Sequence, residues 1–238
     1  MAQNGFLKKS VLVSALIVAA FAFTLFTALQ ANAQTTQSSG PQFLITWRAQ
    51  SSFVPLFYAG KALPNAQSQI AASLTLISNG QPVDLSSQTI YWYLNDTLLG
   101  GGVGTQHITF SPFGGSFGTL TLRVELPDYA SGILIHEITI PVVRPIAVIY
   151  APHPNDKFSD SQITVNALPY FFSASPSALS FRWSVNDATG TSQENPDVLH
   201  INLPNGTPSN FTTAVSLTIQ NPNDSTIAVA SKNLTYQK

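Results

Sequence analysis

The stretch that decides the fold is an eight-residue segment with a central tryptophan. It occurs twice, 91 residues apart, as Thr89-Ile90-Tyr91-Trp92-Tyr93-Leu94-Asn95-Asp96 and as Ser180-Phe181-Arg182-Trp183-Ser184-Val185-Asn186-Asp187. In each copy an apolar residue lies two positions before and two positions after the tryptophan. Because side chains alternate across a strand, these three residues project from one face. We therefore predict two equivalent strands, with Trp92 and Trp183 in the core and a tight turn at the Asn-Asp pair that follows.

The first 33 residues predict a signal peptide. Lys8 and Lys9 are followed by an almost entirely apolar run, and a small-x-small triplet suited to signal peptidase precedes Gln34, the expected mature N-terminus. A retained membrane anchor formed by residues 7–29 is the alternative, because the run is just long enough to span a bilayer. Both interpretations predict an exported protein that is extracellular, at the cell surface or periplasmic.

Composition limits the function classes. Removal of the N-terminal segment leaves 205 residues with eight basic and eleven acidic side chains, a net charge of −3. Such a weak charge without a basic cluster argues against binding of nucleic acid, and contact with a membrane is expected only through the N-terminal segment. The absence of cysteine excludes disulfides, thiolate nucleophiles and cysteine-ligated zinc.

The rest of the chain alternates between short apolar-polar segments and turn signals. Residues 34–42 are small and polar and predict a flexible tether. No 3.6-residue period follows, which is typical of antiparallel sandwiches. The strands expected in the first module are 43–47, 70–76, 89–94, 105–110, 119–126 and 133–143, with a glycine-rich bend at 100–104. Those expected in the second are 146–151, 163–168, 178–186, 198–203, 213–219 and 226–236.

We therefore predict an all-β chain of two tandem Greek-key β-sandwiches, at residues 43–143 and 146–238. Pro141 and Pro145 bracket the join between them, and the absence of Gly and Ser there predicts a stiff linker. The length of about 100 residues per module fits a β-sandwich domain.

The two modules resemble bacterial immunoglobulin-like domains of the polycystic-kidney-disease-repeat type. In that family a Gly-Asp-Gly turn follows the tryptophan strand. The stretch from Trp183 to Asp187, with Gly190, is similar but lacks the motif's glycines, and the stretch from Trp92 to Asp96 departs in the same way. The resemblance covers the mature chain. It implies exported modules that space, stack or bind, and it fixes no particular function.

No residue pattern indicates catalysis. The Gly-x-Ser-x-Gly and HExxH motifs are absent, and the adjacent His136 and Glu137 would point to opposite faces of a strand. We expect no cofactor and no enzymatic activity. Asp156 and Asp160 are the calcium candidates, since calcium takes oxygen ligands, but their spacing matches no loop motif and aspartates are ordinary turn residues.

The outward positions of the tryptophan strands suggest a binding site. Tyr91 aligns with Arg182 and Tyr93 with Ser184, so core packing does not explain why the first module has two outward tyrosines. The irregular segment 50–68 supplies further aromatic residues. The candidate binding residues are Tyr91, Tyr93, Phe53, Phe57 and Tyr58. In the alternative interpretation, the irregular segment folds over the sheet and hides the tyrosines.

The expected function is non-catalytic. We interpret the chain as an exported protein of two modules that acts in adhesion, envelope assembly or protein binding, with a protein or an envelope component as its partner. The alternative is a carbohydrate-binding module, which would stack a glycan on aromatic rings exposed on a sheet face or loop.

Overall fold

The computed structural model describes residues 40–112, 117–130, 132–190 and 195–238. These residues form β-strands and two single-turn 3-10 helices, and no α-helix is found among them. The predicted signal or anchor segment and most of the tether lie outside the described residues. Within the described ranges, no helix has the length and apolarity required to cross a membrane.

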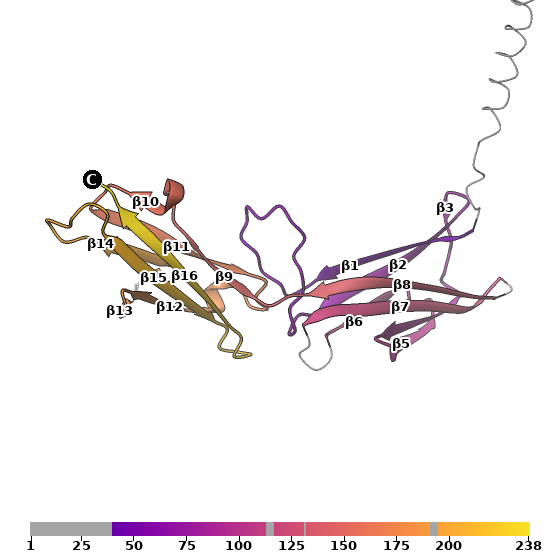
Figure 1. The fold of residues 1–238 in the computed structure, drawn as a ribbon. Coiled ribbons are helices and arrows are strands. Elements are labelled where there is room, and N and C mark those ends of the chain that lie inside the picture. Colours follow the sequence, from indigo (N-terminus) through magenta and orange to yellow (C-terminus); the bar gives the residue numbers. More distant parts are fainter. Residues whose placement is uncertain (1–39, 113–116, 131, 191–194) are drawn as a thin grey trace, which may run out of the picture. The chain divides into compact units, whose positions relative to one another are not determined.

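Two antiparallel sheets form the first sandwich (Figure 1). In one sheet β2 pairs with β1 on one side and with β3 and β6 on the other; the second sheet has the order β5-β4-β7-β8. The sheets enclose an apolar cluster in which Trp92 is fully buried between Ile90 and Leu94. The strands are β1 (Gln42–Ala49), β2 (Ile70–Ser78), β3 (Gln81–Pro82), β4 (Thr89–Leu94), β5 (Thr97–Val103), β6 (His107–Phe110), β7 (Gly118–Tyr129) and β8 (Gly132–Val142).

The second sandwich has its own apolar cluster, centred on Trp183. Its sheets have the orders β14-β11-β9 and β10-β16-β15-β12-β13, and the short strand β10 pairs with β16 in parallel. The elements are β9 (Ile146–Tyr150), η2 (Pro154–Asp156), β10 (Lys157–Phe158), β11 (Gln162–Tyr170), η3 (Pro176–Ala178), β12 (Ser180–Val185), β13 (Ala188–Gly190), β14 (Val198–Asn202), β15 (Thr212–Gln220) and β16 (Ile227–Tyr236).

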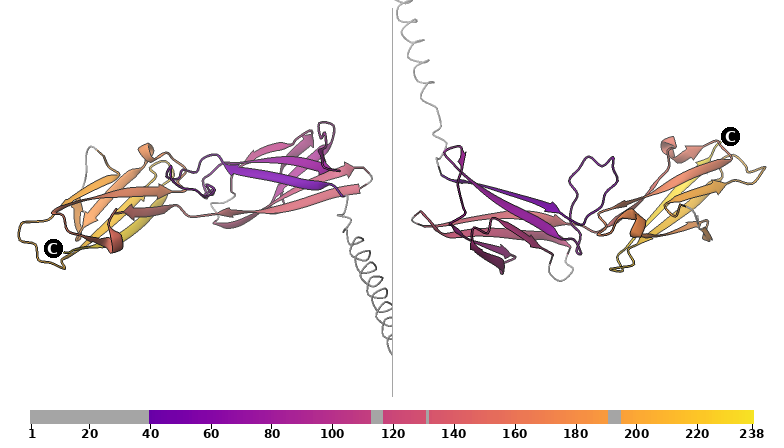
Figure 2. Two further views of the ribbon diagram at one scale, coloured as in Figure 1. Left: turned by 90° about the horizontal axis from the view of Figure 1, so that it is seen from above. Right: turned by 180° about the vertical axis from the view of Figure 1, so that it is seen from behind.

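Both sandwiches have the same topology, and each shows two facing sheets in Figure 2. The strands β1, β2, β4, β5, β6, β7 and β8 correspond in order to β9, β11, β12, β13, β14, β15 and β16. In each set the first, second and fifth strands form one sheet, and the other four form the second sheet. This is the Greek-key arrangement of immunoglobulin-like sandwiches, with the tryptophan on the third main strand. The predicted fold class is therefore confirmed, while the exact module boundaries stay a prediction.

The predicted Asn-Asp turns also repeat. Asn95 and Asp96 have φ values of 46° and 64°, and Asn186 and Asp187 have values of 47° and 66°. Two consecutive left-handed residues form the hairpin turn that suits the twist of antiparallel strands. Each asparagine also accepts a hydrogen bond at its Oδ1 atom, at 2.9 Å, from a backbone N–H of the next strand in the sheet. The turn is thereby fixed to its sheet.

Two local predictions are wrong. The glycines at 100–102 do not form a bend, because β5 continues to Val103 and pairs with β4. A Cβ atom at Gly101 would clash with the backbone carbonyl of Ile90 and lie 2.6 Å from Cδ1 of Tyr91, so only glycine fits against β4 here. Pro141 does not begin the linker either: it lies inside β8, where an edge strand tolerates proline.

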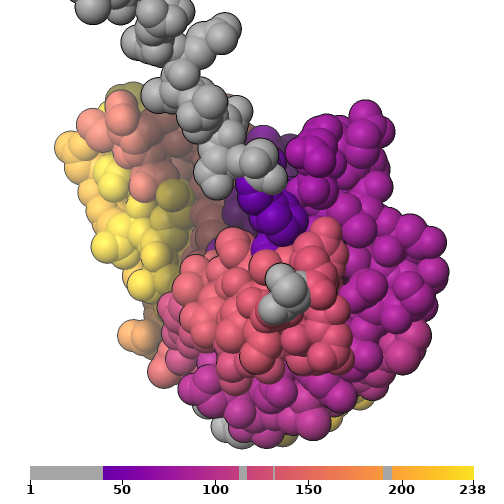
Figure 3. All heavy atoms as spheres, turned by 90° about the vertical axis from the view of Figure 1, so that its right-hand side faces the viewer, coloured from indigo at the N-terminus to yellow at the C-terminus, as the bar shows by residue number. Residues whose placement is uncertain are grey.

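The first residues of β1 lie next to β8, as Figure 3 shows in indigo and salmon. The ring of Phe43 stacks on the ring of His136, with a centroid distance of 5.1 Å and an interplanar angle of 10°. No ladder joins β1 to β8, because β1 pairs with β2 and β8 pairs with β7. This contact therefore connects the two sheets through side chains.

Candidate binding site

The outer face of the β5-β4-β7-β8 sheet carries side chains that the core does not explain. Cross-strand pairing arranges them in two rows. The rows are Leu98–Tyr93–Arg123–Glu137 and Gly101–Tyr91–Glu125–Ile135. We call this surface, with Asp96 at its margin, the tyrosine face. Leu98 and Ile135 are 55% and 52% exposed, so an exposed apolar side chain lies at the β5 end of the first row and another at the β8 end of the second.

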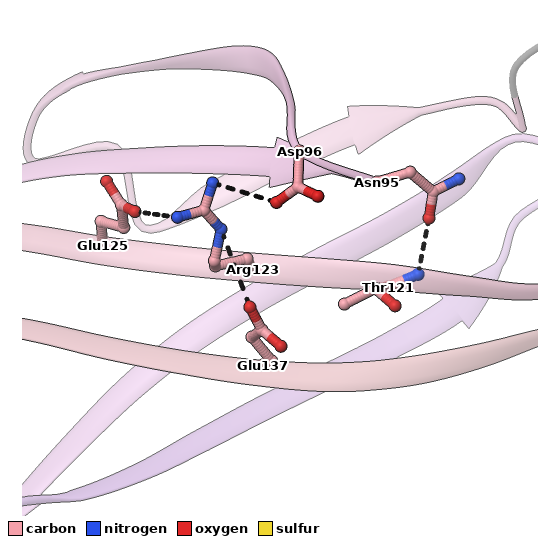
Figure 4. Close-up of polar contacts among 6 residues, drawn as sticks. All are labelled: Asn95, Asp96, Thr121, Arg123, Glu125 and Glu137. Atoms are coloured by element: carbon pink, nitrogen blue, oxygen red, sulfur yellow. Dashed lines mark hydrogen bonds and ion pairs between the residues drawn. The ribbon is translucent and has the colours of Figure 1, made fainter.

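Arg123 is the centre of the tyrosine face (Figure 4). It forms ion pairs with Glu125, with Asp96 at 3.4 Å and with Glu137 at 3.8 Å. Its Nε atom is buried and has no hydrogen-bond partner among the described residues. Three carboxylates around one guanidinium give this cluster a net charge of −2. The face is therefore acidic, although an arginine lies at its centre.

The guanidinium of Arg123 also lies over the ring of Tyr93, 4.3 Å from its centroid. Cation–π contacts of this kind hold both side chains in place. Burial raises the pKa of Tyr93, and the neighbouring Glu125 carboxylate raises it further. Tyr93 therefore stays protonated, and its hydroxyl can donate a hydrogen bond. Both tyrosines are half-buried, so their rings are supported by neighbours and still reach the surface.

The equivalent face of the second sandwich lacks this chemistry. Strand pairing aligns Tyr91 and Glu125 with Arg182 and Thr218. The same registers align three further members of the face with serine residues. Tyr93, Arg123 and Glu137 correspond to Ser184, Ser216 and Ser231. The two tyrosines, Arg123 and its partners Glu125 and Glu137 thus belong to one copy of a repeated fold, which indicates a role other than folding.

The segment 50–68 places the other predicted residues elsewhere. It connects β1 with β2, which belong to the opposite sheet, and its aromatic residues contact residues 170–172. The backbone of Phe53 pairs with that of Phe172, and the ring of Tyr58 packs edge-on against Phe171 at 5.8 Å. Phe57 is 68% exposed. The five predicted residues therefore form two separate sets.

The structure thus answers the question of whether this segment covers the tyrosines. Both tyrosines lie on the outer face of one sheet, and the segment leaves the edge of the other. Tyr91 and Tyr93 stay predicted binding residues, and sequence reasoning did not include the arginine, the carboxylates or the exposed apolar residues beside them. The available signal was the alternation in β7, where Arg123 and Glu125 occupy outward positions opposite the tyrosines.

The calcium candidates are apart from this face. Asp156 forms an ion pair with Lys232, with 2.7 Å between Oδ1 and Nζ, and Asp160 is exposed. Across the described ranges, no group of three or more His, Cys, Asp or Glu side chains is arranged to hold a metal ion. The carboxylate of Asp156 therefore has a cation of the chain as its partner.

Comparison with known proteins shows similarity in fold. No family model and no curated protein sequence matches the chain. Similar solved structures include fibronectin(III)-like modules of Clostridium thermocellum CbhA (14% identity over 82% of this chain and 94% of that one, TM-score 0.28). They also include three N-terminal domains of the bacteriophage RB49 outer capsid protein Hoc (11% identity over 83% of this chain and 59% of that one, TM-score 0.44). A third is the Yersinia pseudotuberculosis adhesin InvE (17% identity over 81% of this chain and 58% of that one, TM-score 0.28).

The fold assignment rests on the strand order of the chain itself, and these proteins supply no residue roles for it. The narrower polycystic-kidney-disease-repeat type stays a prediction. Functional assignment therefore depends on the geometry of the chain's own surfaces.

Proposed function

We propose that this chain is a non-catalytic, exported protein of two immunoglobulin-like sandwiches that binds a protein partner through the tyrosine face of the first sandwich. The observation that carries the proposal is the difference between two equivalent sheet faces. The topology and the buried tryptophan repeat, whereas Tyr91, Tyr93 and Arg123 occur only in the first copy. A difference confined to outward positions is best explained by contact with another molecule.

The chemistry of the face fits a protein partner. Tyrosine and arginine are the residue types that contribute most to protein interfaces, and Arg123 fixes the Tyr93 ring before binding. The net charge of −2 favours a partner surface with basic residues, and Leu98 and Ile135 add apolar contact area. Envelope assembly and adhesion are the processes in which such a face would act.

A glycan-binding function is the second candidate, because Phe57 exposes most of its ring. An exposed ring could stack against a sugar. Tyr93 is less suited to that role, since a guanidinium covers one of its faces.

A capture experiment tests the proposed function. The purified chain is immobilised and exposed to envelope proteins and, separately, to cell-wall glycans. The double variant Tyr91→Ser, Tyr93→Ser should lose the captured protein and keep its fold. The matched control carries Arg182→Ser and Ser184→Ala at the equivalent positions of the second sandwich and should capture normally. Equal capture by both variants would remove the tyrosine face from the proposal, and glycan binding lost on Phe57→Ser would favour the second candidate.

Export is part of the proposal, and it rests on the N-terminal sequence. Mass spectrometry of the protein from its native cell should find an N-terminus at Gln34. Intact Met1 in the membrane fraction would identify the anchored form. Intact Met1 in the cytosol would contradict export.

A further inference from the structure

The second edge of β8 is unpaired in the described residues. β8 is the last strand of its sheet, and its ladder connects it to β7 alone. An edge strand exposes backbone donors and acceptors that another strand can use. This edge is the starting point of the inference.

Pro141 shows which backbone N–H groups of β8 point away from β7, in the plane of the sheet. Proline has no N–H, so in a strand it occupies positions whose nitrogen faces away from the ladder. Residues two positions apart in a strand share this direction. The N–H groups of Ile135, Glu137 and Thr139 therefore point to the free edge, where a further strand would find them unused.

The same edge carries exposed apolar side chains, and they repeat in the second sandwich. Ile133 and Ile135 are 63% and 52% exposed. Strand pairing aligns Ile135 with Val229, so Ile133, two residues earlier, corresponds to Ile227, and these two are 67% and 55% exposed. Outward residues of a strand are not required for the core. Two β-branched residues kept at the same outward positions of both copies therefore indicate a surface that favours an added strand.

The second sandwich protects its edge. β10 pairs with the end of β16, and the backbone N–H of Gln237 donates to the carbonyl of Phe158 at 2.8 Å. Further along the strand, Lys232 pairs with Asp156 of η2, and such charged contacts are a usual protection of free edges.

The first sandwich protects only the end of β8. By strand register Val143 is the equivalent of Gln237, and its N–H donates to the carbonyl of Pro64 at 2.9 Å. The equivalent of Lys232 is Ile138, which is apolar. Among the described residues, the edge from Ile133 to Thr139 therefore has neither a partner strand nor an equivalent of the Lys232 contact, and Glu137 is its charged side chain.

Charge indicates the chemistry of the occupant. Glu137 lies on this edge strand, its side chain is 55% exposed, and its ion pair with Arg123 is long, at 3.8 Å. Arg123 is already paired with two other carboxylates. Glu137 can therefore accept a cation from a neighbouring strand, next to the apolar positions at Ile133 and Ile135.

We propose that β8 accepts an extended segment of a protein partner as an added strand, with two apolar side chains beside Ile133 and Ile135 and a lysine or arginine beside Glu137. In an antiparallel strand this corresponds to a cation followed by apolar residues two and four positions later. Main-chain hydrogen bonds provide the affinity, and the alternate side chains provide the specificity. The inference rests on the proposed function as a protein-binding chain. It shares Glu137 and Ile135 with the tyrosine face but requires no contact with Tyr91 or Tyr93.

A synthetic peptide tests the inference on the purified full chain. The probe is fluorescein-labelled Thr-Lys-Thr-Val-Thr-Val-Thr, and the comparison peptide has Glu in place of Lys. Fluorescence anisotropy should show binding of the Lys peptide. Glu137→Lys should weaken that binding about fivefold and strengthen binding of the Glu peptide by a similar factor. The inference is overturned if Glu137→Lys does not shift the preference from the Lys peptide toward the Glu peptide. It is also overturned if the unaltered chain does not bind the Lys peptide at millimolar concentration.

Backbone variants separate the added strand from simple surface contact. Ile135→Pro removes an outward N–H without removing a bond to β7, and should abolish binding, whereas Ile135→Ala should only weaken it. Val229→Pro, at the equivalent position of the second sandwich, should have no effect, and an equal loss there would contradict the assignment to β8. Tyr91→Ser with Tyr93→Ser should retain peptide binding. Peptide binding without partner capture would thus reject only the proposed function. Partner capture without peptide binding would reject only the added strand.

Discussion

Trp92 and Trp183 each donate an indole hydrogen bond to the backbone carbonyl thirteen residues further along the chain, Trp92 to Thr105 at 2.8 Å and Trp183 to Pro196 at 3.0 Å. Both acceptors precede the fifth main strand of their sandwich. Each tryptophan therefore fills the core of its module and also connects one sheet with the strand that enters the other. This explains why a residue with a polar atom is suited to the centre of an apolar cluster.

The tryptophans should act independently. Trp92→Ala and Trp183→Ala should each lower the free energy of unfolding by about 3–5 kcal/mol, because a large cavity replaces a fully buried ring. The two rings belong to separate apolar clusters, so the losses in the double variant should add to within about 0.5 kcal/mol. Equilibrium denaturation measures this. A coupling above about 1 kcal/mol would mean that the two cores are one cooperative unit.

Gly101 should be far less replaceable than its neighbour. Gly101→Ala places a methyl group against the ring and backbone of Tyr91 and should cost about 2 kcal/mol. Gly100→Ala meets only Cδ1 of Ile108, at 3.9 Å, and should be neutral or stabilising by up to about 1 kcal/mol. Thermal unfolding of the two variants gives the comparison. Similar losses in both would contradict the close approach of β4 to Gly101.

Asn65 should hold the segment 50–68 against residues 170–172. Its side chain is buried and its Nδ2 atom donates to the carbonyl of Phe171, whose φ of 61° is unusual for an aromatic residue. The N–H of Phe53 donates to the carbonyl of Phe172, and the N–H of Phe171 donates to the carbonyl of Phe53. Asn65→Ala should cost about 1–3 kcal/mol and speed hydrogen exchange at these two amides. Gln67→Ala, at an exposed neighbour, is the control. Unchanged exchange at both amides would refute this role.

Asp224 should make the second sandwich sensitive to acid. Partial burial raises its pKa, but hydrogen bonds from Ser173, Thr226 and Asn221 outweigh this effect and hold the pKa below its usual value of 3.8. A depressed pKa contributes stability that is present above the unfolded value and disappears as the pH falls through the folded one. Asp224→Asn should therefore cost about 1–2 kcal/mol at pH 7, and this cost should shrink as the pH falls below 3.8. A pH-independent difference between the two proteins would contradict this assignment.

The tryptophan strands and the Asn-Asp turns could be predicted because they depend on local patterns. The alternation around Trp92 fixes which side chains face the core, and asparagine readily adopts the left-handed turn. The strand character of β5 could not be predicted, because glycine normally marks a bend and here it is explained by the close approach of the β4 backbone and the Tyr91 ring to Gly101. The cluster around Arg123 depends on the register between β4, β7 and β8, which short-range periodicity does not contain. The contact of Phe53 with Phe172 joins residues more than one hundred positions apart.

Site-specific crosslinking tests the central claim most directly. A photo-reactive phenylalanine analogue is placed at position 93 and, in a second protein, at the equivalent position 184. Both proteins are expressed and irradiated in the native cell. The proposed function predicts a covalent adduct with one defined protein from position 93 and no such adduct from position 184. Adducts of equal yield from both positions, or none from position 93, would contradict a partner at the tyrosine face.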